Sequence, residues 1–148
     1  MSGQKLNVLV LPGYQNSGPG HWQTRWEALD PAFVRVQMPD WEHVERDAWC
    51  STLDAAVAAA DSPVVFAAHS LGCLTTAFWA SQYASAAQLA KVAGALLVAV
   101  PDGDGDLSRV WRGWTGRAAG GCGKGQRVGR CAARCAGVAL QERGAVRQ

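Results

Sequence analysis

The 148-residue chain contains no isoleucine and only three lysines, and its three histidines (His21, His43 and His69) all lie in the first half. No apolar run approaches the ~20 residues that a membrane-spanning helix needs. Residues 1–5 lead directly into an apolar segment, which is not how a secretory signal begins. We therefore expect a cytoplasmic protein with no membrane partner.

The cysteines are odd in number and form no C-x-x-C pair, so they indicate neither a disulfide framework nor a zinc site. They are Cys50, Cys73, Cys122, Cys131 and Cys135. We interpret them as free thiols, and we expect no metal and no cofactor. The glycine-containing loop at 12–20 has neither G-x-G-x-x-G nor G-K-[ST], which argues against a nucleotide site.

Composition divides the chain near Asp102. Residues 1–102 hold five Lys and Arg against nine Asp and Glu, whereas residues 103–148 hold nine against three. Eleven of the 17 glycines also lie in residues 103–148, which we call the basic tail. Such a mixture of Gly, Arg, Ala and Cys is what a GC-rich gene yields when translated out of frame. We expect residues 1–102 to form the folded part and the basic tail to be disordered or out of frame.

In residues 1–102, apolar β-rich segments alternate with helical patterns. The predicted strands are 5–11, 33–38, 64–68 and 93–100, and the predicted helices are 21–29, 47–60 and 71–83. Trp22, Trp26 and Leu29 are spaced to share one helix face. This order predicts an α/β fold, a three-layer sandwich around a parallel sheet that is truncated or disordered at its C-terminus.

The segment V-V-F-A-A-H-S-L-G, residues 64–72, is the motif most informative about chemistry. A buried strand that ends in a serine between small residues is typical of a nucleophile elbow, here with Ala68 in place of the usual glycine. Ser70 would lie at the carboxyl edge of the sheet. Acyl transfer also needs two backbone N–H donors for the oxyanion. Leu71 would supply one, and Tyr14 or Gln15 in the loop after the first strand the other.

Three segments carry a family resemblance: L-P-G-Y-Q-N-S-G-P-G-H-W-Q-T-R-W-E, M-P-D-W and A-H-S-L-G-C. Over residues 5–102 the chain resembles small serine hydrolases of the α/β-hydrolase superfamily, in the group named after retinoblastoma-binding protein nine with bacterial YdeN-type members. The resemblance implies an α/β-hydrolase core without a large lid and a small-molecule ester or related acyl substrate. It also implies Ser70 as nucleophile, with Tyr14 and Leu71 as oxyanion donors.

The chain departs from this family in its catalytic triad, which runs Ser, Asp, His in chain order. No histidine follows Ser70. Elbow geometry directs His69 away from Ser70, and we interpret His43 as a solvated loop residue. Asp102 is a candidate acid, although it follows the strand before the one that carries the acid in the family.

His21 is the remaining candidate base, because it opens a helix beside the loop after the first strand. We favour a structural role for it, in contact with Trp22 or Trp41.

Two hypotheses follow from these features. The first is a carboxylesterase-like serine hydrolase, impaired because the triad Asp and His are missing. The alternative is a non-catalytic α/β domain that binds a protein or nucleic-acid partner through the basic tail. The tail has no R-G-G unit, which argues against RNA.

Overall fold

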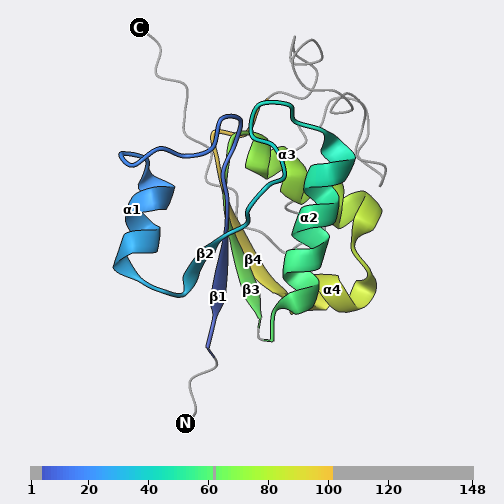
Figure 1. The fold of residues 1–148 in the computed structure, drawn as a ribbon. Coiled ribbons are helices and arrows are strands. Elements are labelled where there is room, and N and C mark those ends of the chain that lie inside the picture. Colours follow the sequence, from blue (N-terminus) through green and yellow to red (C-terminus); the bar gives the residue numbers. More distant parts are fainter. Residues whose placement is uncertain (1–4, 62, 102–148) are drawn as a thin grey trace, which may run out of the picture.

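The computed structural model describes residues 5–61 and 63–101 (Figure 1). In chain order the elements are β1 (Asn7–Leu11), α1 (Trp22–Leu29), β2 (Phe33–Arg35), α2 (Arg46–Ala59), β3 (Val64–His69), α3 (Leu71–Phe78), a π-helical segment (Trp79–Tyr83), α4 (Ala86–Lys91) and β4 (Val92–Val98). Within the described ranges no helix is long and apolar enough to span a membrane. The expectations for the basic tail and for Asp102 lie outside the described residues.

The four strands form one sheet in the order β2-β1-β3-β4, and every neighbouring pair is parallel. Helix α1 lies on one face, while α2, α3 and α4 lie on the other (Figure 1). The predicted parallel sheet with helices on both faces is therefore confirmed. Because all strands run the same way, their carboxyl ends meet at one edge, where sites form in such sheets.

The main core lies between the sheet and the helices α2 and α3. Trp79 packs edge-on against Phe66 of β3 with the ring centroids 5.6 Å apart, and both side chains are fully buried. Every residue of α3 is buried. A helix buried on all sides can be apolar on all sides, as the sequence L-G-C-L-T-T-A-F nearly is. The turn between β3 and α3 is thus held by two buried elements.

Helix α1 differs from the sequence expectation. Its spaced apolar residues do not form a core face, since Trp26 is 38% and Leu29 82% exposed. The aromatic rings instead pack beside one another, with Trp26 edge-on to Trp22 at 4.8 Å and to Phe33 at 5.7 Å. The buried residue of α1 is the polar Gln23. The spacing of apolar residues therefore predicted the position of the helix in the chain correctly, but it did not predict which side of the helix is buried.

Candidate active site

Ser70 lies in the tight turn between β3 and α3, at the carboxyl edge of the sheet. Its backbone has φ 51° and ψ −118°, a conformation that a residue with a Cβ adopts only at a cost. Two hydrogen bonds hold it there. The Ser70 N–H donates to the Val98 carbonyl of β4, and the Ser70 carbonyl accepts from the Cys73 N–H, both at 2.9 Å. The strand-to-helix position predicted for Ser70 is therefore observed.

The small residues around Ser70 have a direct steric reason. A Cβ at Gly72 would lie 2.2 Å from the carbonyl oxygen of Leu11, at the end of β1. Real Cβ atoms do not approach backbone this closely, so α3 can begin beside β1 only with glycine at this position. Ala68 is fully buried, and it is paired with Leu11 on one side and Leu97 on the other.

The loop after β1 contacts this turn through Gly13. A Cβ there would lie 3.0 Å from the Ser70 Cβ and 3.2 Å from the Leu71 nitrogen. The next residues turn sharply, with φ 61° at Gln15 and 64° at Asn16. The Gln15 N–H donates to the Trp41 carbonyl at 2.9 Å. The structure therefore brings this loop and the Ser70 turn together, as the order of motifs predicts.

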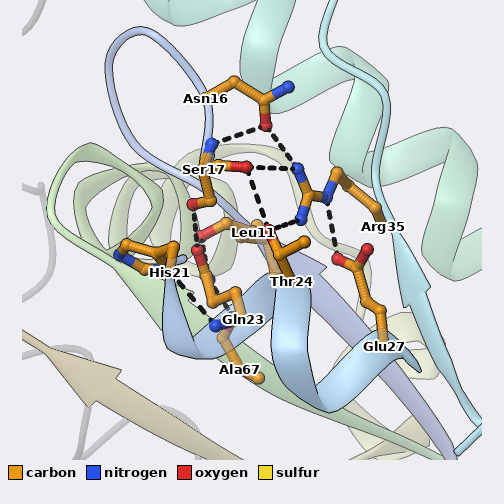
Figure 2. A network of polar contacts seen from close by, with 9 residues as sticks. All are labelled: Leu11, Asn16, Ser17, His21, Gln23, Thr24, Glu27, Arg35 and Ala67. Atoms are coloured by element: carbon orange, nitrogen blue, oxygen red, sulfur yellow. Dashed lines mark hydrogen bonds and ion pairs between the residues drawn. The ribbon is translucent and has the colours of Figure 1, made fainter. Parts of the chain in front are cut away.

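Arg35 of β2 holds the same loop in place, a role that the sequence analysis did not predict (Figure 2). Its guanidinium donates to the Asn16 side-chain oxygen at 2.8 Å and the Ser17 carbonyl at 3.1 Å. It also donates to the Thr24 hydroxyl at 2.8 Å and is ion-paired with Glu27 at 2.7 Å. An arginine in a short strand gives no local signal of such contacts, because its partners come from elsewhere in the chain.

His21 and His69 lie near the turn without engaging the Ser70 hydroxyl. His21 caps α1, since its Nδ1 accepts from the Gln23 N–H at 3.3 Å. Its ring centroid is 5.7 Å from that of Trp22 and 4.5 Å from that of His69. In residues 5–61 and 63–101, no hydrogen bond joins Ser70 Oγ to a histidine. His43 is exposed, and its Nδ1 lies 3.3 Å from Asp40.

Comparison with known proteins shows which family has this arrangement. A family model described as "Serine hydrolase" matches residues 8–114, well over half of the chain. The chain belongs to the serine hydrolase family. The match includes β2, β3, β4, all of β1 except Asn7, and the Ser70 turn, and it runs past Asp102, where the composition changes. No curated protein matches the chain.

A solved structure supports the same fold for this member of the family. The chain is similar to a structure assigned as a YdeN-like hydrolase from Pectobacterium atrosepticum SCRI1043, with 24% identity and a TM-score of 0.58. The alignment covers 72% of this chain and 52% of that one, so the chain spans about half the length of its structural neighbour. At this identity the similarity shows the fold alone.

Metal-binding side chains do not gather in the described part of this family member. Among those residues, no group of three or more His, Cys, Asp or Glu side chains is placed to hold an ion.

Cys50 and Cys73 are free and buried, and burial raises the pKa of each thiol to about 12.

The paired histidines lead to a prediction about pH. Burial lowers the pKa of His21 and His69; Arg35 adds to this at His21, and His21 adds to it at His69. Histidines in the unfolded chain have a pKa of about 6.5, so below that pH the unfolded chain binds more protons than the folded protein does. The stability contributed by neutral imidazoles is thus complete above that pH and is lost as the pH falls toward the lower folded-state pKa values. Denaturant unfolding measured from roughly pH 7 down to 5 should show this loss.

The variant His21→Asn tests the assignment, because asparagine also caps helices well but does not titrate. We expect a weaker dependence of the unfolding free energy on pH than in the unchanged protein. His43→Asn, in an exposed loop outside this pair, is the control and should change the dependence less than His21→Asn does. Equal pH dependence in all three proteins would contradict the assignment to His21 and His69.

Proposed function

We propose that this chain carries a carboxylesterase-like site for small esters or related acyl compounds, with Ser70 as its nucleophile on a nucleophile elbow. The observation that carries the proposal is the strained backbone of Ser70 at the end of β3, with the loop after β1 in contact with it. Strain of this kind persists only where the surrounding structure enforces it, and it is concentrated at functional sites. Membership of the serine hydrolase family agrees with this assignment.

In the proposed reaction, Ser70 Oγ attacks the acyl carbon and the carbonyl oxygen gains negative charge. The Leu71 N–H lies in the first turn of α3, where backbone N–H groups have no acceptor within the helix. Its position directly after the nucleophile suits it to stabilise the oxyanion. Tyr14 is the second donor in our assignment, because it follows Gly13, the residue at which the loop after β1 approaches the Ser70 turn. The Ser70 hydroxyl proton passes to solvent as the Oγ–C bond forms. The bond to the alcohol oxygen then breaks, the alcohol leaves with a proton from solvent, and water hydrolyses the acyl-enzyme.

The residues that the structure describes do not supply the base of this reaction. A serine hydroxyl is a weak nucleophile until an adjacent base takes its proton. The two nearby imidazoles make other contacts instead of bonding to the Ser70 hydroxyl. His21 Nδ1 caps α1, and the His69 ring packs against the His21 ring. We therefore propose that the 148-residue chain positions Ser70 without activating it and is a slow esterase.

A fluorophosphonate probe tests the assignment. We expect slow formation of an adduct that peptide mapping by mass spectrometry locates at Ser70, and no adduct at any position in Ser70→Ala. Hydrolysis of p-nitrophenyl acetate should be slow, and Ser70→Ala should change it little, since oxyanion stabilisation and binding outlast the loss of a triad member. Heat-unfolded protein is the control for non-specific reaction. An adduct at another serine, or none in the folded protein, would overturn the proposal.

A further inference from the structure

One side chain, that of Gln23, holds both ends of the loop that contains Tyr14 (Figure 2). Gln23 lies on α1 and is fully buried. Its Nε2 donates to the Leu11 carbonyl, where β1 ends, at 3.0 Å. Its Oε1 accepts from the Ser17 hydroxyl at 2.6 Å. Leu11 and Ser17 lie three residues before and three residues after Tyr14, so a single carboxamide closes the loop around it.

The same carboxamide reaches the strand that leads to Ser70. The second Nε2 donor of Gln23 engages the Ala67 carbonyl of β3 at 2.8 Å, three residues before Ser70. Both amide donors are therefore used, as a buried primary amide requires. Gln23 thus joins the exit of β1, the far end of the loop and the approach to the Ser70 turn.

The loop needs such anchors because its own backbone is unfavourable. Gln15 and Asn16 are consecutive residues with positive φ, a conformation that is unfavourable for residues other than glycine. The Asn16 side-chain oxygen accepts from the Ser17 N–H and from Arg35, each at 2.8 Å. These contacts and those of Gln23 hold a conformation that the isolated loop would leave.

We infer that Gln23 is a positioning residue, which fixes the Tyr14 N–H and Ser70 relative to each other. The inference rests on the proposed function and adds to it the residue that builds the oxyanion site. Gln23 acts through the loop and the strand rather than through the substrate. Because displacements of about 1 Å in such a site can cost ~100-fold in rate, its loss should slow the reacting step and leave binding unchanged.

The test is the rate of fluorophosphonate labelling at Ser70. In that reaction the Oγ–P bond forms, the P–F bond breaks, fluoride leaves and the hydroxyl proton passes to solvent. We expect Gln23→Leu to lower the maximal labelling rate by roughly 10- to 100-fold at an unchanged half-saturating probe concentration. Ser17→Ala removes one of the three hydrogen bonds of Gln23 and should lower the labelling rate by less. It replaces Gln23→Leu as the test variant if Gln23→Leu does not fold.

Gln88→Leu is the matched control. Gln88 lies on α4, where its amide donates to Asp54 at 2.8 Å and its oxygen accepts from the Ser85 N–H at 2.8 Å. This variant should lose stability but keep the labelling rate when all proteins are compared at a temperature where circular dichroism shows them folded. Amide hydrogen exchange gives a second reading: residues 12–17 should exchange faster in Gln23→Leu, while α3 should not.

Each outcome decides between the proposals. Equal maximal rates in the unchanged protein and Gln23→Leu, an equal loss in Gln88→Leu, or unchanged exchange in residues 12–17 overturns the positioning role alone. Absence of any Ser70 labelling in the unchanged, folded protein overturns the proposed function, and the positioning role with it.

Discussion

Restoring a histidine and an aspartate after β4 is expected to raise p-nitrophenyl acetate hydrolysis by several orders of magnitude. The restored chain keeps residues 1–100. From the Pro101 codon onward its coding sequence is read in a different frame, one that supplies both the histidine and the aspartate. In triad enzymes, removal of either the serine or the histidine costs about 10⁶-fold in kcat. The hydroxyl of Ser70 has no imidazole bonded to it in the described residues, so the gain should approach that scale. The measurement is kcat/KM for the two chains side by side.

The control for this prediction is Ser70→Ala in the restored chain, which should abolish the gain. The same substitution in the 148-residue chain should have little effect. Rapid turnover by the 148-residue chain that Ser70→Ala abolishes would contradict the account. In that case His21 would be the first residue to replace in the search for a base.

The largest effect on stability is expected for Gly72→Ala. The added Cβ would meet the Leu11 carbonyl oxygen at 2.2 Å, and this partner is backbone at the end of an inner strand, which has little freedom to move. We expect a loss of about 3 kcal/mol in the free energy of unfolding, at the upper end of the cost of overpacking. Urea unfolding followed by circular dichroism measures it.

Gly94→Ala, in strand β4 of the sheet beside α3, is the control. A Cβ at Gly94 of β4 would meet nothing within 4 Å. Glycine in a strand interior is itself unfavourable by roughly 0.5–1 kcal/mol relative to alanine, so this variant should be as stable as the unchanged protein or slightly more so. A Gly72→Ala protein as stable as Gly94→Ala would show that the start of α3 is not packed against β1 as described.

Local patterns predicted the parts of this fold that rest on local physics. The apolar runs before Pro12 and Ser70 are buried strands, and the need for small residues around Ser70 follows from the crowding of backbone at a strand-to-helix turn. Short elements were predicted less well. The second strand covers only Phe33–Arg35, and the six-residue helix α4 was not predicted.

The parts that could not be predicted depend on contacts distant in sequence. Gln23 bonds to the Ala67 carbonyl 44 residues away, and a glutamine on an amphipathic helix gives no sign that it is buried. Arg35 likewise reaches Asn16, 19 residues away. A pattern within a short window records which residues are polar, whereas these roles depend on which carbonyls the fold places beside them. For this reason the sequence predicted the Ser70 turn but not the network behind the loop at Tyr14.

The most direct test of the central claim, that residue 70 is positioned for attack and lacks only a base, is the reactivity of Ser70→Cys. A thiol near the start of a helix ionises more readily than a serine hydroxyl and needs no imidazole to react. Cys50 and Cys73 are internal references, because burial raises the pKa of each to about 12. The account predicts that p-nitrophenyl acetate acylates position 70 far faster than Cys50 or Cys73, as mapped by mass spectrometry. Acylation at position 70 no faster than at those two buried thiols would contradict it.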